Sequence, residues 1–360
     1  MGLVSGFLNA CLSLVFGALT LVYCVCVSFS LLKDFVLSPR HTLAVSDGRK
    51  RRPDIPGTES FFIQTSKIRL HALRNDNHAP SKPLMLFLHG FPENSYSWRN
   101  QMNHFRHSYT VVALDMRGFG DSDAPTGLEN YLIDELCLDV CAVVKACGYE
   151  ECILVGHDWG GMVAWNVAAN FPDIILGLVT LCSPHPLAYQ ESACFTLRQA
   201  YLSSYFLFFT TPSLPELYLK SGNGARVREL LVTGPMGIVS VGALTEEDIE
   251  YYVSALSRPG RLTAGLNYYR AAMMASSKRS KRFLDRTLQA NSPPGIPILQ
   301  LYADRDGAFL PSMFETCSFS KKHVALVRLA NCSHWAQQDC PQTVNSHIEA
   351  FTDEIKNNYL

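Results

Sequence analysis

One segment constrains the fold of this chain more than any other: residues 152–165, CILVGHDWGGMVAW. A short apolar run leads into a glycine-rich turn, and a helical pattern follows at once. A turn of the form Gly-x-nucleophile-x-Gly between a strand and a helix presents a reactive side chain above the end of a sheet. The small residues Gly156, Gly160 and Gly161 let such a strained turn close without clashes of Cβ atoms. Asp158 stands at the nucleophile position, so the segment predicts a strand–turn–helix unit with a carboxylate at its tip.

Short apolar runs of the same kind recur along the chain, separated by helix-length patterns. This alternation predicts a mostly parallel sheet that helices bury on both faces. A hairpin of two strands at residues 61–73 precedes the alternation, and a helical pattern at 132–147 falls within it. A chain of 360 residues is long enough for one large α/β domain. The expected strands are residues 83–90, 110–116, 152–158, 176–184, 296–304 and 324–332.

Residues 187–289 break this alternation. The segment is rich in aromatic, helix-like stretches and contains turn residues such as Pro212 and Gly222. An insertion between two strands of an α/β sheet lies above the carboxyl ends of the strands, where such sheets bind their ligands. We therefore expect a helical cap over an α/β core, and the core is formed by residues 58–186 and 290–360.

The amino-terminal segment differs sharply from the rest of the chain. Residues 1–32 contain no Asp, Glu, Lys, Arg or His, and the stretch is long enough to cross a bilayer. A cleavable signal peptide is the alternative, but it needs a basic start and a shorter apolar run. A buried helix is rarely apolar on all sides over such a length. We predict a single transmembrane anchor, joined to the domain by a polar linker at residues 33–57.

Charge around this segment predicts its orientation. The basic residues Lys33, Arg40 and 49–52 all follow the apolar stretch, which places the domain on the cytosolic face, and we expect the endoplasmic reticulum membrane. The twelve cysteines are scattered without the spacing of a metal site or a disulfide framework. The formal net charge of −1 gives no indication of a nucleic-acid partner.

Polar residues after two later strands extend Asp158 into a triad. Asp304 and Asp306 follow the strand at 296–304, and His334 follows the last strand. A nucleophile, an acid and a histidine in this order at strand ends is the chain order of α/β-hydrolase triads. A single loop aspartate more often forms a turn, so the combination carries the prediction.

A second loop supplies hydrogen-bond donors. The sequence His-Gly-Phe-Pro at residues 89–92 follows a predicted strand, and on its own it could form a simple turn. Beside the nucleophile turn, however, the backbone N–H groups of Phe91 and Trp159 would form an oxyanion hole.

An aspartate nucleophile selects the chemistry. A serine that attacked a saturated carbon would form an ether, whereas Asp158 forms an ester that water, activated by His334, can hydrolyse. Epoxides and alkyl halides are therefore the expected substrates, and no metal or cofactor is needed. Opening of an epoxide also needs a proton donor opposite the carboxylate. The cap offers tyrosine hydroxyls at Tyr205, Tyr268 and Tyr269.

From about residue 60 onward the chain resembles the α/β-hydrolase-fold epoxide hydrolases, above all their membrane-anchored vertebrate members. The resemblance implies that Asp158 is the nucleophile, that His334 is the base, and that Asp306, rather than Asp304, orients the histidine. It is carried by the motifs LMLFLHGFPENSYSWR, VALDMRGFGDSDAP, ILVGHDWGGMVAW, LNYYR, YADRDGAFL and SHWAQQDCP.

The resemblance also implies a pair of cap tyrosines that bind the epoxide oxygen. These are Tyr269, in LNYYR, and Tyr205, in SSYFLFF, with Tyr201 as the alternative to Tyr205. The chain departs from the family pattern at Ser333 and Gly307, in the loops of the base and the acid. The implied function is conversion of lipophilic epoxides, including epoxidised fatty acids, to vicinal diols.

Two other functions remain compatible with the same residues. A haloalkane dehalogenase would use the same triad, although Phe91 has no side-chain donor for a halide ion. A membrane-tethered binding protein would retain the fold without the reaction.

Overall fold

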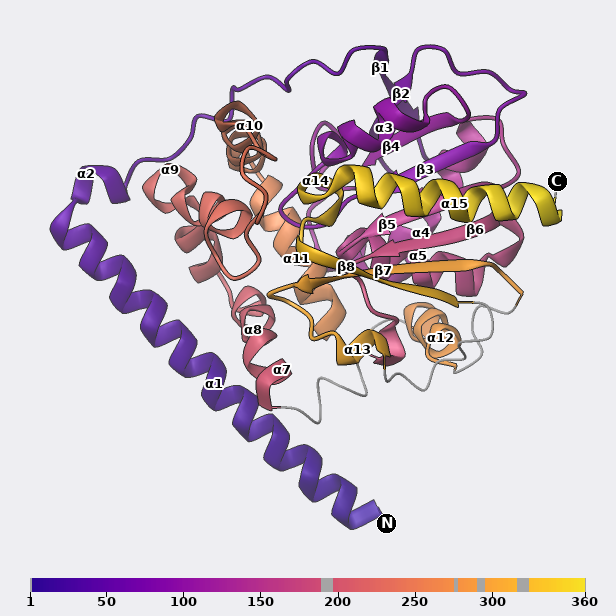
Figure 1. Cartoon of the computed structure of the whole chain (residues 1–360). Helices are drawn as coiled ribbons and strands as arrows, with labels where there is room; N and C mark the ends of the chain where they lie inside the picture. The colour runs from indigo at the N-terminus through magenta and orange to yellow at the C-terminus, as the bar shows by residue number, and fades with distance from the viewer. Residues whose placement is uncertain (1, 189–196, 275–277, 290–294, 316–323, 360) are drawn as a thin grey trace.

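The strands of the described chain form one mixed, eight-stranded sheet in the order β1-β2-β4-β3-β5-β6-β7-β8. A computed structural model describes residues 2–188, 197–274, 278–289, 295–315 and 324–359 (Figure 1). The strands are β1 (Thr58–Gln64), β2 (Arg69–Asn75), β3 (Leu84–Leu88), β4 (Thr110–Asp115), β5 (Cys152–His157), β6 (Ile175–Leu181), β7 (Ile298–Arg305) and β8 (Val324–Ser333).

The sheet is antiparallel at one edge and parallel over the rest. Strands β1 and β2 form the predicted hairpin, and β2 also pairs antiparallel with β4. From β4 to β8 every neighbouring pair is parallel, and at the centre Leu86 of β3 lies between Val112 and Leu154. Because β3 is covered on both faces, all five of its side chains are apolar and buried. The predicted α/β fold is confirmed.

Helices cover both faces of the sheet. Helices α3 and α15 lie on one face, and α4, α5 and α12 lie on the other (Figure 1). In α4, the buried residues Leu136, Val140, Val143 and Val144 recur every three to four positions. Each such side chain contributes about 1.5–3 kcal/mol on burial. The bounds are α3 (Arg99–Phe105), α4 (Ile133–Ala146), α5 (Trp159–Asn170), α12 (Lys278–Thr287) and α15 (Pro341–Tyr359). Shorter elements are η1 (Ser95–Trp98), η2 (Leu128–Tyr131), η3 (Pro172–Ile174), α13 (Ser312–Glu315) and α14 (Ala336–Asp339).

Further helices lie between β6 and β7 in sequence, within the segment predicted as a cap. Arg270 of α11 links several of them, because it forms an ion pair with Glu216 of α9 at 2.8 Å and donates a hydrogen bond to the Thr211 carbonyl oxygen after α8. Helix α12 follows them in sequence but packs on α4 and α5 of the core. The other helices are α7 (Leu197–Leu202), α8 (Ser204–Thr210), α9 (Leu214–Val232), α10 (Glu246–Ser257) and α11 (Arg261–Met273).

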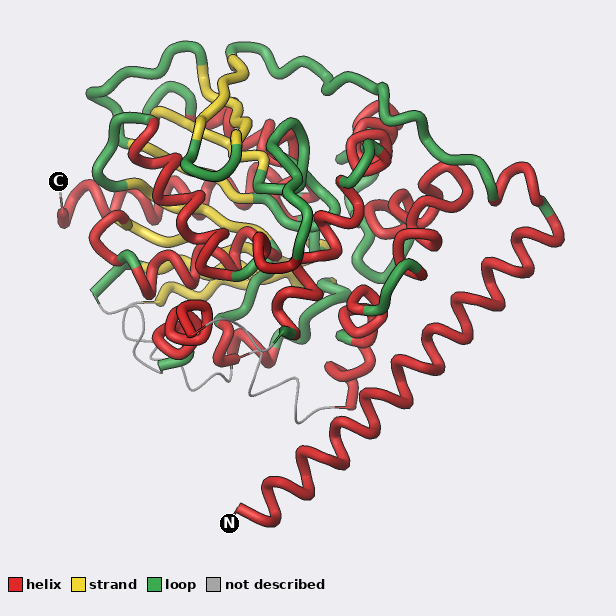
Figure 2. The backbone as a smooth tube through the Cα atoms, turned by 180° about the vertical axis from the view of Figure 1, so that it is seen from behind, coloured by secondary structure: helices red, strands yellow, loops and turns green. Residues whose placement is uncertain are grey.

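The amino-terminal helix α1 (Gly2–Leu37) extends beyond the rest of the molecule (Figure 2). Its segment Thr20–Leu37 is long and apolar enough to cross a membrane, with a mean hydropathy of 1.8. The helix continues five residues past the predicted anchor and into the predicted linker, where the short helix α2 (Pro39–Thr42) follows. Helix α1 lies along α8 and α9, and α2 also contacts α9.

Candidate active site

The nucleophile turn joins β5 to α5 and holds Asp158 in a strained backbone conformation. Its torsion angles are φ 51° and ψ −118°, a region that residues with a side chain rarely adopt. A glycine is required at position 160, because a Cβ atom there would lie 2.2 Å from the Leu88 carbonyl oxygen. The turn therefore packs directly on the end of β3 and directs the carboxylate above the sheet edge.

The loop after β3 approaches the same carboxylate. A Cβ atom on Gly90 would lie 2.2 Å from Oδ1 of Asp158, so only glycine allows this approach. The backbone N–H of Phe91 donates to the same Oδ1 at 2.9 Å. The backbone N–H of Trp159 adds a second hydrogen bond to the carboxylate. Both predicted oxyanion-hole donors thus lie at Asp158.

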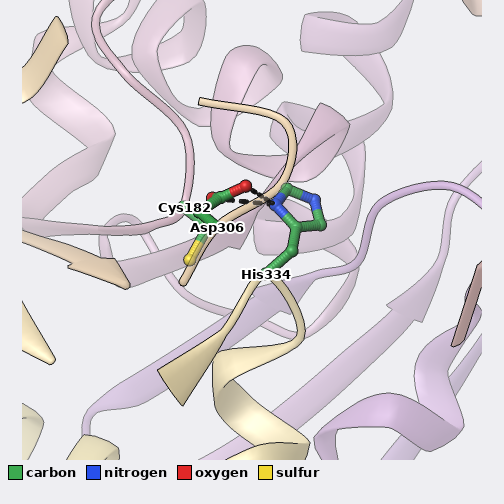
Figure 3. Close-up of side chains that lie close together, drawn as sticks. All are labelled: Cys182, Asp306 and His334. Atoms are coloured by element: carbon green, nitrogen blue, oxygen red, sulfur yellow. Dashed lines mark hydrogen bonds and ion pairs between the residues drawn. The ribbon is translucent and has the colours of Figure 1, made fainter. Parts of the chain in front are cut away.

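The loops after β7 and β8 complete the set of polar groups. Nδ1 of His334 lies 2.9 Å and 3.0 Å from the two carboxylate oxygens of Asp306, as Figure 3 shows. On the other side of the ring, Nε2 of His334 lies 3.6 Å from Oδ2 of Asp158. Asp304 points elsewhere, because it pairs with Arg328 at 3.3 Å. Parallel strands end at one edge, which is why residues so distant in sequence meet here.

Burial and the neighbouring charges together set the pKa values of this group. Burial alone would lower the pKa of His334, but the charge of Asp306 and hydrogen bonds to both aspartates outweigh it and raise the pKa to about 10. Burial alone would raise the pKa of Asp158, yet the hydrogen bond and charge of His334 lower it below its ordinary value. At neutral pH the site therefore holds an ionised Asp158 beside an imidazolium.

A cavity lies in front of Asp158 and receives side chains from both the core and the cap helices. The cap contributes Tyr205 and Tyr269 to its lining, and the core contributes Asp158 and His334. Tyr201 lies outside this lining, with 72% of its surface exposed. The other lining residues are Phe91, Pro92, Phe209, Leu230, Met236 and Trp335.

Aromatic rings enclose Tyr269 closely. Its ring centroid lies 5.0 Å from that of Trp159, 5.0 Å from that of Phe209 and 5.7 Å from that of Phe91. The Tyr205 ring lies 6.3 Å away. Since these walls are mostly apolar, charges inside the cavity are weakly screened, which strengthens electrostatic effects on a reacting bond.

A buried hydrogen-bonded pair behind the site, His157 and Glu93, was missed at the sequence level. Nδ1 of His157 lies 3.0 Å from Glu93, and both side chains are fully buried. Nε2 of His157 donates to the backbone carbonyl of His334 at 2.8 Å. Gln337 and Gln338 donate to the Glu93 carboxylate. The sequence could have indicated this contact, because His157 directly precedes Asp158 and Glu93 directly follows the His-Gly-Phe-Pro loop.

The scattered spacing of the cysteines did not indicate the disulfide that the described residues contain. Cys332 and Cys340 are joined by a disulfide that spans the loop carrying His334. Their separation of eight residues gave no recognisable framework, and the turn into α14 brings the two thiols together. The bond limits the movement of the segment that carries His334.

The loops that depart from the family pattern are accommodated by close packing. Gly307 lies against the cap, because a Cβ atom there would lie 2.4 Å from the Pro235 carbonyl oxygen. The backbone N–H of Ser333 donates to Asp339 at 2.7 Å, which holds the residue before His334 in place. Both departures therefore fit the loops in which they occur.

A third side chain, Cys182, lies beside Asp306 and His334 (Figure 3). Its thiol, a carboxylate oxygen of Asp306 and a ring nitrogen of His334 lie within 4.8 Å of one another, a set that could hold a metal ion. Both oxygens of Asp306 already pair with His334. Burial also raises the pKa of the Cys182 thiol well above its ordinary value, which disfavours the thiolate that a metal requires. These residues fit an acid–base pair better than a metal centre.

Comparisons with known proteins agree with this geometry. A family model described as alpha/beta hydrolase fold matches residues 83–340. Epoxide hydrolase 4 of Mus musculus is 36% identical over 359 residues, which cover 96% of each chain. Epoxide hydrolase 3 of Xenopus tropicalis is 36% identical over 295 residues, or 81% of this chain and 77% of that protein. The crystal structure of a Bacillus megaterium epoxide hydrolase with an inhibitor superposes with a TM-score of 0.69 at 29% identity, over 81% of this chain and 100% of that chain.

The fold and the carboxylate at the nucleophile turn define the class: α/β hydrolases with an aspartate in place of the usual serine. Within that class, the identity over nearly the whole chain shows that this protein belongs to the epoxide hydrolase family.

Proposed function

We propose that this protein hydrolyses epoxides to vicinal diols through an ester formed on Asp158. One observation carries the proposal: a single cavity is lined by an ionised carboxylate and a paired histidine from the core and by two tyrosines from the cap. Epoxide opening needs these groups in these positions, because a carbon must be attacked on one side while the ring oxygen is protonated on the other.

The first step forms the ester. Oδ1 of Asp158 accepts from Phe91, so Oδ2 is the oxygen left to attack the epoxide carbon. The carbon–oxygen bond of the ring breaks, and its electron pair stays with the oxygen. That oxygen takes a proton from Tyr205 or Tyr269. Neutral phenols suit this task, because they keep their protons at neutral pH and still donate a strong hydrogen bond.

The second step hydrolyses the ester. Once Asp158 is esterified it carries no charge, so one of the contacts that raise the pKa of His334 disappears. The histidine then loses its proton more readily, and that proton returns through solvent to the tyrosinate left by the first step. The neutral histidine can next take a proton from the attacking water, while Asp306 stabilises the imidazolium that results. The N–H groups of Phe91 and Trp159 would hold the oxyanion of the tetrahedral intermediate. Collapse of the intermediate releases the diol and restores Asp158.

Dehalogenation is the competing reaction of the same triad. A released halide needs N–H donors around it, and the Phe91 side chain offers none. The two tyrosines, in contrast, are needed only where an oxygen leaves. We therefore place epoxide opening first.

A product assay tests the proposed reaction. The purified full-length protein is incubated with aryl epoxides, epoxidised fatty acids and matched bromoalkanes and chloroalkanes. We expect a vicinal diol from at least one epoxide and no halide from the haloalkanes. Halide release without diol formation would establish the dehalogenase function. Tight binding without either product would establish the binding-protein function.

We also propose that α1 anchors the protein in a membrane with the domain on the cytosolic side. The basic residues after the apolar stretch support this orientation. The Cys332–Cys340 disulfide favours the opposite side, because disulfides persist in oxidising compartments. Protease treatment of sealed microsomes decides between them. Digestion of the domain from outside is expected for the cytosolic orientation, and protection until the vesicles are opened contradicts it.

A further inference from the structure

The second half of α1 has two different apolar faces. One face packs against the cap: Val27 is buried, and the Tyr23 ring lies 4.9 Å from the Phe208 ring of α8. On the same face, Arg226 of α9 donates to Asp34 at 2.9 Å and fixes the position of the helix along the cap. This docked face extends for about 16 Å from Tyr23 to Asp34.

The opposite face of the same helix is exposed. Large apolar side chains cover it, and Phe29 at 68% is among the most exposed of them. A patch of this kind on a protein surface marks an interaction site. The other large apolar side chains on it are Leu21, Val22, Val25, Leu32, Phe35 and Val36.

The breadth and length of this face indicate what covers it. A second copy of the chain would pair along a narrow seam flanked by charged residues. Helix α1, in contrast, has no charged residue on any side up to Leu32. Residues 2–32 would form a helix about 46 Å long, against about 30 Å for the hydrocarbon core of a bilayer. The apolar stretch as a whole is therefore longer than a straight crossing requires, and a tilt of the helix accommodates the excess. Tilt brings the exposed face of the second half of α1 toward the membrane boundary.

Helix α8 connects this surface with the reaction site. Phe208 contacts the Tyr23 ring of α1, while Tyr205 and Phe209 on the same helix line the cavity. A helix is only about 10 Å across. Hence the cavity and the apolar helix α1 lie on two sides of α8.

We propose that the exposed face of α1, together with α7 and α8, lies against the lipid bilayer, and that lipophilic epoxides enter the cavity from the lipid beside α8. The inference rests on the proposed anchor and the proposed epoxide hydrolysis. It adds the partner surface, a bilayer, and the side of the cap from which substrate arrives.

Fluorescence quenching tests the bilayer contact without any activity. Phe29→Trp places a probe on the exposed face of α1, and Phe62→Trp places the matched control on β1, where Phe62 is 49% exposed. Each full-length variant is reconstituted in phosphatidylcholine vesicles with or without brominated acyl chains, and the wild type gives the background of the native tryptophans. We expect strong quenching of the Phe29→Trp probe and little of the control. A Tyr201→Trp variant should also be quenched, which reports on α7.

Two results would overturn the bilayer contact. One is equal, weak quenching at positions 29 and 62. The other is a Phe29→Trp probe that lipid does not quench while the reconstituted protein cross-links as a dimer through α1, because a second copy would then cover the face.

A transfer experiment tests the route of entry. Vesicles carrying the enzyme are given a long-chain alkyl epoxide, either in their own bilayer or in separate donor vesicles from which it transfers slowly. Epoxide in the enzyme's own bilayer should be hydrolysed much faster than epoxide moves between vesicles. Epoxide supplied in donor vesicles should be hydrolysed only as fast as it moves from those vesicles to the enzyme's vesicles. Equal rates, both limited by release of the epoxide into water, would contradict entry from the lipid.

A short, water-soluble aryl epoxide in detergent serves as the control for the reaction itself. If that epoxide is not hydrolysed, the proposed function fails, while the quenching experiment still decides the bilayer contact. If it is hydrolysed but the long-chain epoxide follows the aqueous route, only the route is wrong.

Discussion

The two walls of the cavity are built in different ways. On the core wall, Asp158, Phe91 and His334 follow strand ends, and backbone hydrogen bonds or ion pairs fix each of them. On the cap wall, Tyr269 is 3% exposed, whereas Tyr205 is only partly buried and sits on the short helix α8, which packs against α1. The groups proposed to form bonds are thus each held by several contacts of the core wall, while the position of the proposed proton donors depends on helix packing. Changes in the core wall should have the larger effects.

The largest expected difference between two neighbouring residues of the core wall is the effect on kcat of replacing Asp306 or Asp304. We expect Asp306→Asn to lower kcat by roughly 10³–10⁴-fold, because the amide favours the wrong ring tautomer of His334. Asp304→Asn is the matched control, two residues away and paired with Arg328, and it should change kcat less than about threefold. Steady-state rates with one aryl epoxide measure both. A larger loss at Asp304 than at Asp306 would reverse the assignment.

The cap wall should respond less strongly, because two donors share one task. Tyr269→Phe and Tyr205→Phe are each expected to lower kcat by about 10²-fold, and the double variant further. Tyr201→Phe, at an exposed position on the neighbouring helix α7, should leave kcat unchanged. Single-turnover rates of ester formation measure the effect at the step concerned. If ester formation requires the Tyr201 hydroxyl and not that of Tyr205, the proposed contact of Tyr205 with the reacting oxygen is wrong.

The pairing of protonated His334 with the aspartates of the core wall should make the free energy of unfolding depend on pH. His334 has a pKa of about 10 in the folded chain against 6.5 ordinarily, so its contribution is complete below pH 6.5 and is lost as the pH rises through 10. We compare the free energy of unfolding of the wild type with that of His334→Gln. Their difference should shrink between pH 6.5 and 10 by more than about 1.4 kcal/mol, the equivalent of one pKa unit. A constant difference over this range would contradict the ion-paired histidine.

The disulfide beside the base should have the smallest effect. Cys340→Ser is expected to lower the free energy of unfolding by about 2 kcal/mol and to change kcat less than tenfold, since the His157 and Asp306 contacts of His334 remain. Denaturant unfolding measures this, with Cys147→Ser, at a partly buried free cysteine that ends α4, as the control. A reductant should lower the stability of the wild type but not that of Cys340→Ser. Equal sensitivity of both to reductant would show that the disulfide is absent in solution.

The same difference between the walls explains what the sequence could predict. Asp158, Asp306 and His334 each follow an apolar run, and parallel strands bring their ends to one edge, so local patterns were enough. The hydrogen-bonded pair of His157 with Glu93 was not foreseen, because two buried polar residues give no periodic signal.

The cap was harder to predict, because its contacts join helices distant in sequence. That Tyr205 rather than Tyr201 lines the cavity depends on the rotation of α8, which contacts with Tyr269 and α1 determine. The Cys332–Cys340 pair likewise depends on a turn that only the fold creates. Apolar character alone indicated that α1 could span a membrane but not that one of its faces packs on the cap.

A single turnover in oxygen-18 water tests the ester on Asp158 most directly. Enzyme in excess is mixed with an aryl epoxide, and the first diol is analysed by mass spectrometry. We expect its new hydroxyl to carry ordinary oxygen, because that atom comes from the carboxylate. Asp158→Ala should form no diol. The control variant Asp173→Ala, at an exposed acid after α5, should behave as wild type. Heavy oxygen in the first diol would show that water attacks the epoxide directly and would contradict the role of Asp158 as nucleophile.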